Sequence, residues 1–236
     1  MSVLTSLGIL FLAVLCCWFL QLVPSVFAIF YHYASAKSTK EKTLDLSSYF
    51  LIGSELITGI LLFVLYFIVF EFLSDNPFLD TTIIKWIVAG IIAALGFFIM
   101  FFYYRKDKKG TALFITRKAA NSLTMRAKTA RKKSDIFMLG VVSGIMEIFF
   151  VLPVYLIVVT EIIRFPGEDF LQPVLLFLFI LFSMSPVMTM RGHFWRGKNL
   201  AEVERAREKN KNFSKIILGS TYVLLAILIV LFRIFA

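Results

Sequence analysis

One acidic side chain stands out in the apolar parts of this sequence. Glu147 lies about 11 residues into the apolar segment 136–159, roughly 17 Å along a helix and close to the middle of a bilayer. Charged groups are costly at that depth, so an ionisable residue there is a candidate for function. We therefore expect Glu147 to be a proton or cation site. The alternative is a neutral carboxyl that hydrogen-bonds to a neighbouring helix.

Small and polar residues share a helical face with Glu147. Gly140, Ser143, Gly144 and Glu147 follow the spacing i, i+3, i+4 and i+7. We assign Ser143 and Gly144 to the same site on this basis. Gly140 and Gly144 also match the small-xxx-small pattern of closely packed membrane helices, so packing is the second explanation for this face.

Two further polar residues lie within apolar segments. Glu55 is about five residues into the segment 50–70, where it is either part of the site or within reach of the cytoplasmic headgroups. Gln21 lies near the middle of the segment 3–30, before Pro24. We include Gln21 as a counterpart of Glu147 in the first part of the chain, with hydrogen bonding between helices as the alternative.

Prolines interrupt three of the apolar segments. Pro24, Pro153 and Pro186 each remove a backbone N–H and are predicted to kink their helices. Such kinks are typical of a central cavity, although simple curvature explains them equally well.

His32 and His193 both fall at cytoplasmic segment ends, but aromatic neighbours favour an interfacial belt over a metal site. We predict no metal and no cofactor.

Composition places these residues in a membrane protein. The chain has 236 residues, of which 59% are hydrophobic and 17% charged, and the mean hydropathy is +0.86. Each apolar block is long enough to cross a hydrocarbon core of about 30 Å, where backbone groups must be paired within a helix. We predict an all-α polytopic integral membrane protein with six spans, at 3–30, 50–70, 83–104, 136–159, 170–190 and 216–235.

The charges of the loops predict the orientation. Basic residues gather between the first and second spans, across residues 105–133, and across residues 191–215. The other two loops are acidic, with Glu71 in one and Glu161 in the other. Because cytoplasmic loops collect Lys and Arg, we expect both termini outside, in a bacterial cell membrane. The net charge of +10 is then a topology signal and does not indicate nucleic-acid binding.

The long basic segment divides the chain into two halves of three spans. We predict a first half at 1–104, a basic cytoplasmic connector at 105–135 and a second half at 136–236. The topology makes the halves inverted, and residues 86–90 (WIVAG) resemble residues 215–219 (KIILG). Inverted three-plus-three repeats are a recurring plan of transporters, with the site near the midplane. Residues 111–133 are either an amphipathic helix on anionic headgroups or a solvated linker.

The layout resembles the lysine-exporter superfamily of small six-helix carriers. The resemblance rests on residues 139–144 (LGVVSG), which run into Leu152-Pro153, and on the repeat layout. It implies a carrier of amino acids, metals or thiol reductants. Thiol-reductant carriers of that group have a cysteine in each half, whereas Cys16 and Cys17 are adjacent in the first span. We therefore expect both cysteines to be packing residues.

These features together predict a small secondary transporter, proton-coupled, that exports a small or cationic solute. No enzyme motif was found, so we expect no catalytic activity. The alternative is the permease or an accessory subunit of an ATP-driven exporter or other membrane complex. Residues 199–212 would then be a coupling helix, or else a solvated extension of the fifth span. The expected partners are the lipid bilayer, a small solute or proton, and either a second copy or an ATPase.

Overall fold

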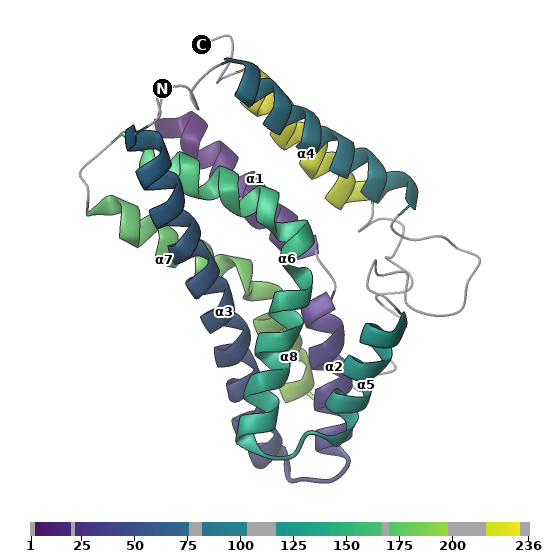
Figure 1. The fold of residues 1–236 in the computed structure, drawn as a ribbon. Helices are drawn as coiled ribbons and strands as arrows, with labels where there is room; N and C mark the ends of the chain where they lie inside the picture. Colours follow the sequence, from purple (N-terminus) through teal and green to yellow (C-terminus); the bar gives the residue numbers. More distant parts are fainter. Residues whose placement is uncertain are drawn as a thin grey trace.

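The described part of the chain is helical throughout in a computed structural model (Figure 1). It covers residues 3–19, 22–75, 82–102, 117–166, 170–197 and 216–231. The helices are α1 (Val3–Phe19), α2 (Leu22–Ser35), α3 (Lys40–Asp75), α4 (Thr82–Phe102), α5 (Arg117–Thr129), α6 (Lys133–Ile163), α7 (Leu171–Ser183), α8 (Ser185–Trp195) and the unlabelled helix Ile216–Leu231. Every apolar segment predicted as a span is therefore helical where it is described.

Several of the apolar segments are bent pairs instead of straight helices. α1 and α2 meet at 42°, α7 and α8 also at 42°, and the two segments of α6, Lys133–Ile148 and Val151–Ile163, meet at 85°. Within the described ranges, one helix, α3, is long and apolar enough to cross a membrane alone. That number rises to four if each bent pair is one span. Shorter apolar helices at Trp86–Phe101 and Ile216–Leu231 complete the set.

Glycines bring α3 and the first segment of α6 into backbone contact. A Cβ atom added to Gly53 would overlap the carbonyl of Phe137, and one added to Gly140 would overlap the carbonyl of Phe50. A Cβ atom on Gly144 would instead meet the side chain of Ile57. This is the close approach that small residues permit in membrane helices. It joins the two helices along the part of the molecule nearest their N-terminal ends.

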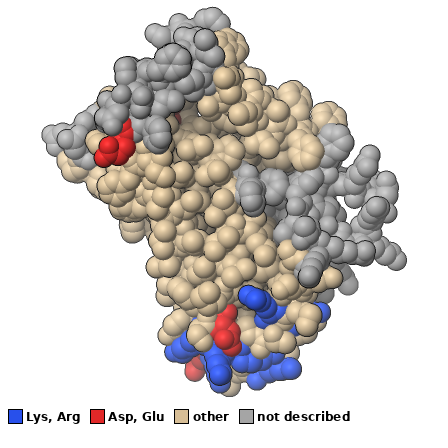
Figure 2. Space-filling view, in the orientation of Figure 1, with Lys and Arg blue, Asp and Glu red and all other residues tan. Residues whose placement is uncertain are grey.

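Positive charge gathers at one end of the molecule. Figure 2 shows Lys and Arg side chains gathered at the end where α2 meets α3 and α5 meets α6. Lys40 lies 5.6 Å above the ring of Trp195 there, and Lys133 forms a 3.0 Å ion pair with Asp45. We refer to this as the basic end. The starts of α1 and α7 lie at the opposite end (Figure 1).

The connector contains a helix instead of being a plain linker. α5 packs against α2, and its Leu123 and Ala127 are buried in a cluster with Phe27 and Phe30. α6 also starts three residues before the predicted span.

A second correction concerns Glu161, which we placed in an outward loop. Glu161 lies within α6 and is only 2% exposed, with the Ser6 hydroxyl 3.3 Å from its carboxylate.

The break in α6 recurs at a constant separation from the break between α1 and α2, whereas α3 is unbroken and α7–α8 is broken. The first segment of α6 ends at Ile148 and the second starts at Val151, each 129 residues after its counterpart in α1 and α2. Pro24 and Pro153 have the same separation. In Figure 1, α6 runs antiparallel to α1 and α2, and α7 with α8 runs antiparallel to α3. The helix Ile216–Leu231 likewise lies beside α4 and antiparallel to it.

Candidate functional site

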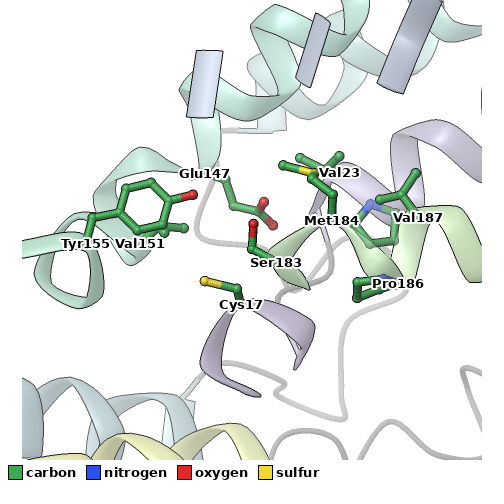
Figure 3. Close-up of a pocket in the computed structure, with 10 residues that line it drawn as sticks. Cys17, Val23, Glu147, Val151, Tyr155, Ser183, Met184, Pro186 and Val187 are labelled. Atoms are coloured by element: carbon green, nitrogen blue, oxygen red, sulfur yellow. The ribbon is translucent and has the colours of Figure 1, made fainter. Parts of the chain in front are cut away.

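Three helix breaks meet around Glu147 (Figure 3). They are the break between α1 and α2, the bend of α6, and the break between α7 and α8. A cavity of about 30 Å³ at this point is lined by Cys17, Val23, Pro24, Glu147, Val151, Tyr155, Ser183, Met184, Pro186 and Val187. Helices interrupted at membrane depth are tolerated where backbone lines a cavity or is buried in protein. The breaks therefore mark this region as a candidate binding site.

Prolines stand just after all three breaks. Pro24 is the third residue of α2, Pro186 is the second of α8, and Pro153 is the third of the segment that begins at Val151. A proline at the start of a helix costs little, because the first N–H groups have no helical partner. The three predicted kink residues thus lie where a new helical segment begins. Because each proline lacks an N–H and has a fixed φ angle, it favours the start of a new helix there over continuation of the previous one.

Glu147 caps the N-terminus of α2. Its Oε1 accepts a hydrogen bond from the Leu22 N–H at 3.0 Å, and the Val23 N–H also contacts the carboxyl. In an uninterrupted helix the Leu22 N–H would bond to the carbonyl four residues earlier. The break leaves that N–H free, and a carboxyl oxygen at a helix N-terminus satisfies it and interacts favourably with the helix dipole.

Glu147 also lies between two cavities. The second cavity, again about 30 Å³, is lined by Val23, Ile57, Thr58, Leu61, Gly144, Glu147, Ile148, Val151, Tyr155 and Met184. Tyr155, which is buried, hydrogen-bonds to Thr58 in its wall. Each cavity has room for about one water molecule. Among the described residues that line either cavity, Glu147 is the only Asp, Glu, Lys or Arg, so a proton or a cation matches the charge of the site better than an anion.

Of the predicted polar and small site residues, Gly144 lines a cavity with Glu147 and Ser143 does not. Ser143 is buried and donates to the carbonyl of Gly140 in its own helix. Gly144 lines the second cavity, but it also packs on Ile57 as part of the α3–α6 contact. Close packing of α6 against α3 therefore explains Gly140 and Ser143 better than a role in the site does.

Neither Glu55 nor Gln21 can be assigned to the site from the described residues. Glu55 lines neither cavity, and its Oε1 is buried without a hydrogen-bond partner among the described residues. The residue as a whole is half-buried. Gln21 lies outside the described residues. Residues 199–212, the predicted coupling helix, also lie outside them.

Sequence reasoning missed Trp18. Its Nε1–H donates to the carbonyl oxygen of Phe182 at 2.6 Å, across the junction of α1 with α7. Pro186 is four residues after Phe182 and has no N–H to offer that carbonyl. The position of Pro186 does signal a free carbonyl at Phe182, but nothing in the sequence pattern indicates which side chain would satisfy it.

The adjacent cysteines have different surroundings. Cys16 is fully buried in the apolar core, as a packing residue would be. Cys17 lines the cavity together with Ser183 and Glu147 (Figure 3). No family model matches this chain, and no curated protein or solved structure matches it either. The site must therefore be interpreted from its own geometry.

Proposed function

We propose that the protein is a small secondary transporter in which Glu147 carries a proton or binds a cationic solute. In this proposal six spans form two inverted halves, and the basic end faces the cytoplasm with both termini outside. The convergence of three broken helices on one buried carboxyl carries the proposal. Discontinuous helices that meet at the repeat interface are a recurring feature of transporter sites.

The constant separation of the break in α6 from the break between α1 and α2 supports the inverted repeat. A chance resemblance between apolar helices would not place a break, its following proline and a later glycine at one constant separation. Gly90 and Gly219 share the 129-residue separation of Pro24 and Pro153. Since corresponding helices run antiparallel, the expected relation is a rotation of about 180° around an axis in the membrane plane. This is also the layout implied by the resemblance to the lysine-exporter superfamily.

The size of the cavities supports a carrier that is closed in this conformation. Room for about one water molecule beside Glu147 suffices for a proton to reach the carboxyl, but not for an amino acid to bind. Transport then requires the walls to separate on one side at a time. A carboxyl between two cavities can exchange its proton with whichever side is open, which couples the proton to the solute.

Transport in liposomes tests this proposal. The purified protein would be reconstituted with a pH-sensitive dye inside, and proton movement would be followed when lysine, arginine or tetramethylammonium is added under an imposed pH gradient. We expect solute-dependent proton movement with the wild type and none with Glu147→Gln, which cannot titrate. Glu161→Gln is the matched control, because it changes another buried carboxyl of α6.

The same assay can overturn the assignment. Equal rates for wild type and Glu147→Gln, at matched protein incorporation, would remove Glu147 from the mechanism. Loss of activity in Glu161→Gln as well would show that the assay reports damage to α6 instead of chemistry at Glu147. Wild-type protein that moves no proton with any of the three solutes would refute the assignment of a cationic solute.

A further inference from the structure

Trp18 and Glu147 occupy equivalent positions in the two halves. Each is the residue before the last one of the segment that precedes its break, and the two are 129 residues apart. Each side chain also crosses to another element and bonds a backbone group that a break leaves free. Glu147 accepts from the Leu22 N–H, whereas Trp18 donates to the Phe182 carbonyl.

The Trp18 contact lies directly behind the cavity wall. Cys17 and Ser183, which precede Trp18 and follow Phe182 in the sequence, both line the cavity (Figure 3). α1 and α7 extend from this point toward the end opposite the basic end (Figure 1). Separation of their ends would therefore open the cavity toward that side.

The contact can break without disrupting the core. The Trp18 side chain is 37% exposed and Phe182 is 54% exposed, so the bond lies at the surface between two helices. The Met184 N–H also approaches the Phe182 carbonyl, but across only two residues, where bonds are weak. In an apolar environment the indole N–H is thus the main partner of this carbonyl. Water that enters on opening can replace it.

We propose that Trp18 is a gating residue whose hydrogen bond to Phe182 holds α1 against α7 and closes the cavity on the side opposite the basic end. The Glu147 contact with Leu22 lies in the other direction, where α2 leads to the basic end (Figure 1). The role of the gate in transport rests on the proposed function. The gate itself is a property of the closed cavity and can be measured without transport.

Cys17 provides a built-in probe of the gate. The chain has two cysteines, so a Cys16→Ser background leaves a single thiol at the cavity wall. The rate of modification by a membrane-impermeant thiol reagent would be measured from each side in oriented vesicles. We expect Trp18→Phe to raise the rate by about tenfold, from the side opposite the basic end only, because one hydrogen bond is lost. Trp195→Phe, at the basic end, is the matched control and should leave the rate unchanged.

A rescue variant separates the hydrogen bond from the bulk of the indole. Pro186→Ala supplies an N–H four residues after Phe182, which can bond to its carbonyl as in a regular helix. We expect Trp18→Phe to have little effect on Cys17 modification in the Pro186→Ala background. A tenfold increase in both backgrounds would show that ring volume closes the cavity, and would overturn the proposal.

Unchanged modification in Trp18→Phe would also overturn the gate, while leaving transport by Glu147 intact. If Trp18→Phe is not obtained as a monodisperse protein, the Pro186→Ala variant alone decides. With its carbonyl bonded within the helix, Phe182 no longer needs Trp18, and the wild-type indole should become more mobile in fluorescence anisotropy. Unchanged anisotropy of Trp18, in a background with the other tryptophans replaced by Phe, would then contradict the proposal.

Discussion

The first segment of α6 packs against α3 in one way and against α2 in another. Along α3, Gly53 and Gly140 allow the two backbones to touch. At the end of the same segment, Glu147 reaches across to a helix start and leaves small cavities on both sides. We call the glycine contact between α3 and α6, at Gly53 and Gly140, the seam. We call the contact between Glu147 and the start of α2, with its two cavities, the junction. The two lie within two turns of the same helix.

The contrast separates two uses of residues that look alike in sequence. Glycines on a helix face allow close approach, and the dispersion attraction between the two backbones then holds the helices in one arrangement. Prolines after a break do the opposite, because they start a new helix and leave backbone groups that side chains must satisfy. The seam is suited to hold α3 and α6 together while the junction changes. Substitutions in each of the two contacts test whether the seam stabilises the pair while the junction changes.

The largest effect is expected in the seam. Gly140→Ala would place a methyl group against the carbonyl of Phe50, and we expect it to lower stability by about 2–3 kcal/mol, in the upper part of the range for overpacking. Gly90→Ala on α4 is the control, because a Cβ atom there meets nothing. Thermal unfolding in detergent measures both. Equal melting temperatures for the two variants would mean that the seam can relax, and would contradict this account.

The junction should respond to the acceptor at position 147 and not to its charge. Glu147→Leu leaves the Leu22 N–H without a partner and should cost about 1–2 kcal/mol, the usual penalty for an unsatisfied group. Glu147→Gln keeps an acceptor oxygen and should unfold close to the wild type. The same heating assay decides, and a Gln variant as unstable as the Leu variant would show that the carboxylate charge itself stabilises α2.

A third glycine contact tests whether close backbone packing also stabilises the pair formed by α4 and the helix Ile216–Leu231. A Cβ atom on Gly96 would lie 2.9 Å from the carbonyl oxygen of Gly219, between α4 and the helix Ile216–Leu231. We expect Gly96→Ala to cost about 1 kcal/mol, less than Gly140→Ala, because the added Cβ atom would lie 2.9 Å from its nearest neighbour at Gly96 but 2.3 Å from it at Gly140. A loss larger than that of Gly140→Ala would reverse the order of the two seams.

Sequence periodicity and hydropathy were sufficient to locate the helices. Apolar blocks of about 20 residues are visible without a structure, because the bilayer imposes their length. The breaks within them were harder to place. Val23-Pro24 suggested a kink, but an apolar residue before a proline occurs in straight helices as well, and only the structure locates the break before Leu22. Glu161 was misplaced because a charged residue near a helix end resembles a loop residue.

Only part of the candidate site was predictable: Glu147, Gly144, Pro24 and Pro186 line its cavities, and the remaining lining residues were not predicted. Glu147 was identified from depth alone, since depth can be counted along a helix. Ser143 and Gly144 share its face, but a helical face is wide enough to contact both α3 and the cavity, so sharing a face did not ensure sharing a function. Cys17 and Ser183 come from other helices. Their approach to Glu147 depends on the break angles, which local sequence does not encode.

The smallest effect is expected at the basic end of the seam. Lys133 at the start of α6 lies 3.0 Å from the Asp45 carboxylate and 3.1 Å from the Tyr49 hydroxyl of α3. The hydrogen bonds to Tyr49 and to Asp45 raise the pKa of Lys133 above its ordinary value, so the lysine stays charged through the neutral range. Stability from this raised pKa is present below the ordinary pKa of lysine and is lost only as the pH rises above it.

Even so, we expect Lys133→Ala to leave the melting temperature within the error of measurement at neutral pH. The Lys133 and Asp45 side chains are 56% and 53% exposed, and exposed ion pairs gain little because water competes for both partners and salt screens them. The seam is held instead by the backbone contact at Gly53 and Gly140. Melting curves at low and high salt would check this, and a salt-sensitive destabilisation by Lys133→Ala would show that charge, and not close packing, fixes the start of α6 against α3.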